Sequence, residues 1–408
     1  MSQILACHDC DLVQTLPPLA MGMVAQCPRC GAILRRTQFN SINRTVGWLL
    51  AGVILYALAV SLPFLAMQTQ GVSNQISLTT GIVTLYRQGM GGLGLVVLLT
   101  CLVVPLFTML GLLYVLLPLL KGLRPPWAAQ VFALTQRLKP WGMMEVYMLA
   151  ILISMIKLAK MASLVPGPAL YSLIILIFVL AAALVSLDSH LIWEKLTPPG
   201  LADPPVTSGA ALISCEVCHL LLPAAADRPC CPRCGVRVSP RKPNSLSRCW
   251  ALVLSSAILW LPANLLPVTI TQALGSPPHA DTIMSGVIYF FQTGSWYIAL
   301  IIFIASLVVP IAKLMILVFL LLSLRFGWRT GPRERTRLYR LTEIVGRWSM
   351  VDVYVVSILV ALVRLGIWAN IKAGPGIAYF AALVILTMFA ANSFDPRLIW
   401  DQERKSNG

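Results

Sequence analysis

Eight long apolar stretches run along the chain, and each is long enough to cross a bilayer as a helix. The charged residues gather in the segments between them. This pattern predicts an all-α integral membrane protein with eight transmembrane helices, four in each half of the chain. We expect these helices over Arg44–Met67, Leu93–Leu120, Met143–Val165 and Pro168–Trp193, and over Cys249–Ile270, Ser295–Leu324, Ser349–Ala369 and Pro375–Trp400.

The order of apolar and polar positions in the second half repeats that of the first. Val103-Val104-Pro105 returns as Val308-Val309-Pro310, and a Trp-x-Met-x-Glu/Asp-x-Tyr run begins at both Trp141 and Trp348. Because each half has an even number of spans, the second copy must enter the membrane from the same side as the first. The halves are therefore parallel repeats, as in transporters whose halves are related by an axis along the membrane normal.

Two shorter segments have apolar residues at helical spacing but are not apolar throughout. One lies between Pro126 and Pro140, and the other follows Pro332. This spacing predicts interfacial helices that lie on the inner leaflet. The arginines of the second segment could bind anionic headgroups or only fix the orientation of the chain, and the sequence favours neither.

Composition supports a membrane location, and the distribution of charge predicts the orientation. Hydrophobic residues make up 58% of the chain, charged residues only 11%, and the mean hydropathy is +0.81. The net charge of +16 comes mainly from Lys and Arg on the side of the predicted spans where both termini lie. Loops rich in Lys and Arg face the cytoplasm. We therefore expect cytoplasmic termini, and we assign the positive charge to orientation rather than to a nucleic-acid partner.

A group of four cysteines precedes each set of helices. Each group has two Cys-x-x-Cys turns, and the second turn reads Cys-Pro-Arg-Cys-Gly. Paired turns of this kind place four thiolates around one tetrahedral ion, and glycine accepts a positive φ. Because a cytoplasmic location disfavours disulfides, we predict two structural Zn²⁺ ions, with iron as the alternative metal and Cys230 as an alternative ligand to Cys231. The expected ligands are Cys7, Cys10, Cys27 and Cys30, and Cys215, Cys218, Cys231 and Cys234.

Four cysteine ligands leave no open position on the metal, so catalysis by these ions is not expected. The chain has no nucleotide-binding P-loop and no acid/base constellation in a soluble domain, and we do not expect an enzyme. The predicted domains are a zinc ribbon (1–40), a four-helix unit (41–195), a second ribbon with a linker (196–244) and a second four-helix unit (245–408).

Several basic residues fall inside the predicted spans, where an unpaired charge is costly, and three of them, Lys313, Lys157 and Arg364, are candidates for a functional role. Lys313 lies about midway along the sixth helix, and its counterpart in the first half is Thr108. Lys157 and Arg364 occupy equivalent places in the third and seventh helices. We expect a substrate or transport role for these three residues, although Lys157 and Arg364 could instead reach the outer headgroups. The hydroxyls that could face Lys313 are those of Ser306, Ser349 and Thr387.

Carboxylates recur at matching places near the cytoplasmic ends of helices in both halves. Their recurrence favours a shared structural role over proton transfer. The carboxylates are Glu145, Asp188, Asp352 and Asp395, and the candidate partners are Lys139, Arg347 and Arg397.

These features together resemble the paraquat-inducible protein A family, including its intermembrane lipid transport branch. The resemblance covers nearly the whole chain and rests on Cys-Pro-x-Cys-Gly, a Leu-Pro near the end of the first helix, the Trp-x-Met-x-Glu/Asp-x-Tyr run and a terminal Asp-x-x-Leu-Ile-Trp. It implies tetraspanin-like four-helix units in the inner membrane of a double-membraned bacterium. It also implies a periplasmic MCE-domain partner that forms a tunnel towards the outer membrane. A polar network in the second half, which the resemblance implies as well, fits Lys313, Ser306, Ser349 and Thr387.

Two functional hypotheses follow from the residues and the resemblance. In the first, the protein is a lipid-transport subunit that loads or receives phospholipid at the periplasmic leaflet and passes it to the tunnel. Its docking surface would be the two largest outward loops, Gln68–Met90 and Thr271–Gly294. In the second, the protein only anchors or gates the tunnel and senses metal or redox state through its ribbons.

Overall fold

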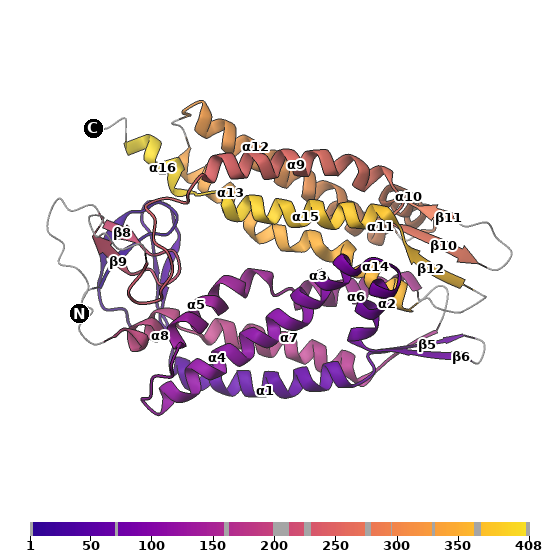
Figure 1. The fold of residues 1–408 in the computed structure, drawn as a ribbon, viewed down its shortest axis with the longest axis horizontal. Helices are drawn as coiled ribbons and strands as arrows, with labels where there is room; N and C mark the ends of the chain where they lie inside the picture. The colour runs from indigo at the N-terminus through magenta and orange to yellow at the C-terminus, as the bar shows by residue number, and fades with distance from the viewer. Residues whose placement is uncertain are drawn as a thin grey trace.

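The computed structural model describes residues 3–69, 72–158, 163–198, 212–223, 230–273, 279–294, 296–328, 331–362 and 369–404. The molecule is elongated, with the cysteine-bearing β-hairpins at one end and two small β-sheets at the other (Figure 1). We call these the ribbon end and the sheet end. The long helices run lengthwise between them, so each connects a ribbon-end segment to a sheet-end segment.

Eight helical spans in the described part of the chain are long and apolar enough to cross a membrane. This confirms a mostly helical, multi-pass membrane protein. The elements follow one another in the same order in both units, which lie side by side (Figure 1). The first unit has α1 (Ser41–Ser61), α3 (Gly91–Leu98), α4 (Val104–Leu120), α5 (Ala128–Leu138), α6 (Met144–Leu158) and α7 (Pro168–Ser186). The second has α9 (Ser245–Leu265), α11 (Trp296–Phe303), α12 (Val309–Arg325), α13 (Pro332–Gly346), α14 (Val351–Leu362) and α15 (Pro375–Ser393).

Two antiparallel sheets, which the hydrophobic pattern did not predict, close the sheet end. In each sheet the strand that follows the first helix of the unit lies in the centre. The strand before the last helix pairs with it, so Met67 faces Leu164 and Thr271 faces Ile371. The strands are β5 (Leu65–Thr69), β6 (Val72–Ile76) and β7 (Ser163–Pro166), and β10 (Thr269–Ala273), β11 (His279–Asp281) and β12 (Ala369–Ala373).

The predicted outer ends of four helices are therefore wrong, because strands occupy Met67, Val165, Ile270 and Ala369. A proline explains where the first helix of each unit stops. Pro63 and Pro267 disfavour helical backbone in the preceding residue. Leu62 and Leu266 accordingly adopt extended conformations, with ψ of 157° and 148°.

The third span of each unit is a broken helix. We predicted the segments before these spans as separate interfacial helices, but α5 and α13 pack along α4 and α12. They then continue into α6 and α14 after short 3₁₀ turns, η2 (Lys139–Trp141) and η4 (Arg347–Met350). Pro140 lies within the first of these turns and cannot donate a backbone hydrogen bond, which accounts for the break there.

The second span of each unit contains a π-helical turn. These turns are η1 (Leu99–Val103) and η3 (Ile304–Val308), and both precede a proline, Pro105 or Pro310. A proline ring collides with a carbonyl one turn earlier, and a wider turn relieves that collision. π-Turns inside α-helices are frequent at functional sites, so the residues on η1 and η3 are candidates for a functional site.

The fourth span of each unit ends earlier than predicted. The helices expected to reach Trp193 and Trp400 stop at Ser186 and Ser393, and short helices α8 (Ser189–Leu196) and α16 (Arg397–Arg404) follow. A serine of the first helix stabilises each break. Ser41 Oγ donates to the Ser186 carbonyl at 2.7 Å and accepts from the Asp188 amide at 2.8 Å. Ser245 makes the same two contacts in the second unit.

The two units share one hydrophobic core and meet through α6 and α14. The rings of Tyr147 and Tyr354 pack edge to face with their centroids 5.6 Å apart. The Tyr354 hydroxyl donates to Thr100 Oγ1 at 2.8 Å. The short helix α2 (Leu78–Arg87) also packs on α14, where Gly81 lies against Ser357. In the second unit the equivalent helix, α10 (Ile283–Gln292), packs on α11 around a small separate core.

Candidate metal centres and transport site

Each cysteine turn is held by backbone hydrogen bonds and ends in a left-handed residue. In the first ribbon, the Asp11 and Gly31 amides donate to the Cys7 and Cys27 carbonyls at 2.9 and 2.8 Å. The residue after each pair has positive φ, which glycine was expected to supply: Gly31 and Gly235 both have φ of 72°. Asp11 and His219 take the same conformation at 58° and 55°. The flanking strands are β1 (Gln3–Ala6), β2 (Val13–Leu16), β3 (Val24–Gln26), β4 (Ile33–Arg36), β8 (Leu212–Ser214) and β9 (Leu221–Pro223).

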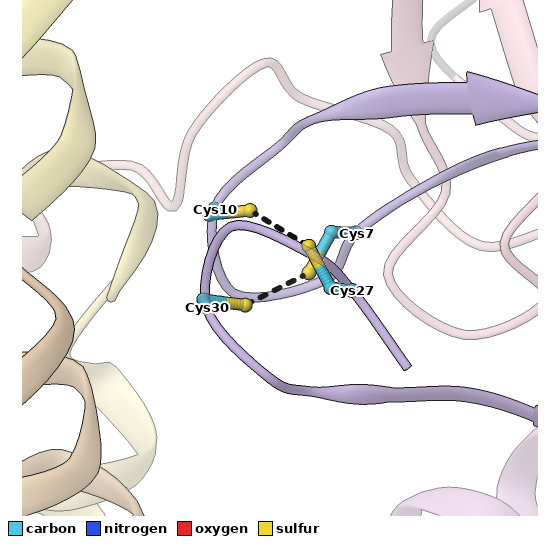
Figure 2. A group of neighbouring side chains, drawn as sticks. All are labelled: Cys7, Cys10, Cys27 and Cys30. Carbon is cyan, nitrogen blue, oxygen red and sulfur yellow. Dashed lines mark hydrogen bonds between the residues drawn. The ribbon is translucent and has the colours of Figure 1, made fainter. Parts of the chain in front are cut away.

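The turns bring the eight predicted sulfurs into two groups of four. In the first group, Sγ of Cys7 lies 3.4 Å from that of Cys30, and Sγ of Cys10 lies 3.5 Å from that of Cys27 (Figure 2). In both groups all four ligand atoms lie within 4.8 Å of one another. Tetrahedral coordination with Zn–S bonds of about 2.3 Å separates sulfurs by about 3.8 Å. Each group is therefore suited to hold one metal ion.

The structure decides between the two adjacent cysteines of the second ribbon. Cys231 Sγ lies 3.5 Å from Cys218 Sγ within the buried group. Cys230 is exposed, and its backbone pairs with Arg237. Cys231 is thus the fourth sulfur of the group. Cys101 and Cys249 lie buried in helices, apart from both groups.

The first ribbon is docked on the second membrane unit, and its core is continuous with the core of that unit. The Arg340 guanidinium in α13 contacts Asp9 Oδ2 at 2.6 Å and donates to Cys30 Sγ at 3.4 Å. Arg29 lies 4.4 Å from the centroid of the Trp400 ring. Hydrogen bonds from a charged arginine are stronger than neutral ones, so these contacts stabilise the docking of the ribbon on α13.

Three of the chain's four histidines lie where the two ribbons and α8 meet. The ring of His219 is 6.2 Å from that of His8 and 6.1 Å from that of His190. Burial lowers the pKa of His219 to about 4 and also lowers the pKa of His190. The lowered pKa values favour the neutral form of the His219 and His190 rings. We did not single them out in the sequence, where they carry no spacing signal.

Lys313, the leading candidate for a transport residue, is buried in α12 with 3% of its surface exposed. Its Nζ donates to Thr387 Oγ1 at 3.2 Å, and Thr387 in turn donates to the Val384 carbonyl at 2.8 Å. Among the described residues, no carboxylate forms an ion pair with Lys313. A buried ammonium group without an anionic partner is costly, and the transport role of this lysine stays a prediction.

Ser306 and Ser349 lie on η3 and η4, two turns that contact each other. Both hydroxyls are buried, and neither has a hydrogen-bond partner within the described part of the chain. A buried hydroxyl without a partner costs about 1–3 kcal/mol. Polar groups of this kind are what a bound polar ligand would satisfy. A cavity of about 190 Å³ lies beside Lys313.

The equivalent place in the first unit has a smaller cavity and no lysine at the position of Lys313. Its cavity beside Thr108 is only about 60 Å³, and the Thr108 hydroxyl donates to the Val104 carbonyl of its own helix at 2.8 Å. The repeat places Cys101, Thr108, Gly142 and Leu180 where the second unit has Ser306, Lys313, Ser349 and Thr387. The two units therefore share a framework, and at these positions the second unit has a buried lysine that is hydrogen-bonded to a hydroxyl.

Two other predicted transport residues cannot be placed beside this site. Arg364 lies outside the described residues, and Lys157 lies in α6 with its side chain outside the described part. Their role stays a prediction.

The four carboxylates divide into different structural roles. Asp395 accepts from Arg397 Nε at 2.9 Å and from the Lys242 amide at 3.1 Å, which confirms the predicted pairing with Arg397. Its counterpart Asp188 instead caps α8 by accepting from two backbone amides. Glu145 lines the small cavity beside Thr108 together with Lys139. The side chain of Arg347 lies outside the described part.

The fold and the two kinds of site define a class of protein: a multi-pass membrane protein of two parallel four-helix units, each preceded by a Cys₄ ribbon. The sequence model of the family described as "Paraquat-inducible protein A" matches residues 42–197 and 246–404. The chain belongs to this family.

Similar proteins cover the chain almost completely. "Intermembrane transport protein PqiA" of Escherichia coli (strain K12) is 35% identical over 405 residues, 98% of this chain and 96% of the relative. "Lipophilic envelope-spanning tunnel protein A" of the same strain is 32% identical over 98% of this chain and 92% of the relative. A "Probable intermembrane transport protein" of Haemophilus influenzae is 29% identical over 98% and 96%. No solved structure matches the chain.

Proposed function

We propose that this protein is an inner-membrane subunit that moves phospholipids or other hydrophobic molecules between the inner and outer membranes. It hands lipid to or from a periplasmic tunnel built by an MCE-domain protein. The names of its relatives, which describe intermembrane transport and an envelope-spanning tunnel, support this role. The observation that carries it is the buried Lys313, which donates to the Thr387 hydroxyl beside a cavity of about 190 Å³. A site of this kind is suited to bind a polar headgroup.

The proposed orientation places the ribbon end and both termini in the cytoplasm. Its support is the excess of Lys and Arg in the segments of that end, which matches the bias of cytoplasmic loops. The sheet end then faces the periplasm. Its two sheets and the helices α2 and α10 come from Gln68–Met90, Thr271–Gly294 and the strands that pair with them, and we propose this surface as the docking site for the tunnel protein.

We propose that each ribbon holds one structural Zn²⁺ ion, bound by its four cysteines. Zinc in such a site supplies folding energy and no open position for a reactant. The ribbons then join the two membrane units at the cytoplasmic end. No catalytic role is assigned to the protein.

Substitution of Lys313 tests the transport site. Lys313→Ala and Lys313→Asp should both impair envelope integrity at normal protein level, with Asp the more severe because it reverses the charge. Lys121→Ala, at the exposed C-terminus of α4, is the control and should behave as the unaltered protein. Detergent sensitivity of cells and phospholipid transfer between vesicles are the measurements. Normal detergent sensitivity and normal phospholipid transfer in both Lys313 variants would contradict a transport role for this site.

The second candidate function is an anchor or gate for the tunnel whose ribbons sense metal or redox state. The contact between Arg340 and Cys30 favours it, because it links a metal group to a membrane helix. Replacing Cys231 and Cys234 with serine discriminates between the two functions. If the ribbons are structural, the variant loses about one zinc per chain and its folding. A folded variant with an altered response to oxidant would support sensing. Cys230→Ser is the control and should keep both zinc ions.

A further inference from the structure

The cavity beside Lys313 lies between the two units, and both units line it. Lys313, Gly346 and Asn392 come from the second unit, and Lys139 and Pro140 come from the first. Lys139 belongs to η2, the break in the first unit's third span. Lys313 is buried, whereas Lys139 is exposed. Lysines of both units therefore line one cavity.

The sequence repeat shows how this arrangement arises. Counted from Trp141 and Trp348, Lys139 and Gly346 occupy equivalent positions, just as Thr108 and Lys313 do. Each unit thus has one lysine at this level, but on a different helix. Gly346 makes room for the second one, because a Cβ added there would lie 2.8 Å from Lys313 Nζ.

The other lining groups suit a molecule with a phosphate and an apolar part. Asn392 adds an amide, and Ile344, Met388 and Ala391 add apolar surface. Glu343 is the carboxylate in the lining, and it is exposed. Lys313 pairs with no carboxylate in the described residues, so its charge is available to an anion.

We propose that Lys139 and Lys313 together bind the phosphate of a phospholipid headgroup at the interface between the two units. A lysine ammonium group binds phosphate as a point charge. It therefore does not need the planar two-bond geometry with which an arginine guanidinium binds phosphate. The inference deepens the proposed transport function and rests on it. It adds a role in lipid binding for Lys139, which the sequence also offers as a partner for the recurring carboxylates.

Retention of lipid by the purified full-length protein tests the site. The protein is reconstituted in nanodiscs that contain phosphatidylglycerol and diacylglycerol, extracted into detergent, and its bound lipid is counted by native mass spectrometry. Lys139→Gln and Lys313→Gln should each lower retained phosphatidylglycerol by about tenfold, which is the loss of one hydrogen bond to a charged group. Diacylglycerol should be unchanged. Lys139→Arg should restore retention, and Lys121→Gln is the control.

Competition with inorganic phosphate identifies the source of the phosphate. Glycerol phosphate or inorganic phosphate should displace phosphatidylglycerol only at high concentration, because neither has the acyl chains. If inorganic phosphate binds tightly to the lysines while phosphatidylglycerol does not compete, the assignment to a lipid headgroup is overturned. Unchanged retention in both glutamine variants, or an equal loss of diacylglycerol, would also overturn it.

Vesicle-to-vesicle transfer separates this inference from the function on which it rests. If the variants lose transfer but keep phosphatidylglycerol, the phosphate site is wrong and transport stands. If retention depends on both lysines but the unaltered protein transfers no lipid with its tunnel partner, transport is wrong and the phosphate site stands.

Discussion

Residues at matching positions of the two units perform related but different tasks. Asp188 and Asp395 both follow the last long helix of their unit, and a serine hydroxyl contacts the backbone of each. Asp188 then caps a short helix, whereas Asp395 also binds Arg397, which in turn binds Glu216 of the second ribbon. One arginine thus turns a helix cap into a connection between the ribbon and the membrane unit.

Acid should weaken this connection. Burial by itself would raise the pKa of Asp395, but Arg397 and the backbone amides hold it below its usual value of 3.8. A depressed pKa stabilises the fold above pH 3.8, and this contribution is lost as the pH falls through the lower pKa of the folded state. Asp395→Asn should therefore cost about 3 kcal/mol at pH 7. It should also reduce the difference in stability between pH 7 and acid.

Melting temperature measured in detergent from pH 7 to pH 3 checks the prediction. The exposed Glu334→Gln serves as the control and should melt like the unaltered protein at pH 7. Parallel pH profiles for Asp395→Asn and the unaltered protein would show that this carboxylate does not couple stability to pH.

At the scale of elements, the sheet end depends on two close approaches of backbone to backbone. The chain before the last helix of each unit passes directly against the carbonyl of Pro63 or Pro267, and Gly167 and Gly374 occupy these points. Gly374 also donates its amide to the Val268 carbonyl at 2.8 Å. Neither glycine is needed for its φ, which is −87° for Gly167 and −84° for Gly374. What they provide is space.

Gly374→Ala should lower stability because its Cβ would meet the Pro267 carbonyl, a backbone group that cannot rotate away. Overpacking of this kind costs about 1–3 kcal/mol. Gly286→Ala in α10 is the matched control: nothing lies within 4 Å of its Cβ, and alanine favours the helix by about 1 kcal/mol. Thermal unfolding of the two variants should move in opposite directions. If both melted alike, the sheet end would be more adaptable than the contact indicates.

At the scale of the molecule, two sets of contacts join the halves. One lies between the membrane units, where Tyr354 contacts Thr100 and Gly81 lies against Ser357. The other lies at the ribbon end, where Asp9 of the first ribbon pairs with Arg340 of the second unit. Each half thus supplies part of the other's surroundings, and the cavity that contains Lys139 and Lys313 exists only when both are present.

Halves produced as separate chains should therefore still assemble. A break placed in 199–211, between the last described helix of the first half and the second ribbon, leaves both sets of contacts intact. We expect an affinity tag on one half to recover the other from membranes. Gly81→Leu should weaken recovery, because even a Cβ there lies 3.3 Å from the Ser357 carbonyl. Gly92→Leu, with nothing within 4 Å, is the control. Halves that each hold zinc but never copurify would contradict this interface.

The span count, the parallel repeat and the eight cysteine sulfurs could be predicted from the chain alone, because each depends on local properties. An apolar stretch needs only its own length to span a bilayer, and Cys-x-x-Cys turns position their sulfurs through adjacent residues. The place of Lys313 was also predictable, since a lysine within an apolar stretch is visible without a fold. The hydrogen bond from Lys313 to Thr387 agrees with the prediction that the Thr387 hydroxyl could face this lysine.

Contacts between distant residues were decided only by the tertiary structure. The sheets at the sheet end pair strands from opposite ends of a unit, and alternation in such short apolar segments does not distinguish a strand from the end of a helix. The choice of Cys231 over Cys230, the histidines at the ribbons and the cavity that Lys139 and Lys313 share likewise depend on how separate elements pack. Sequence periodicity records which face of an element is buried, but not which residue of another element covers it.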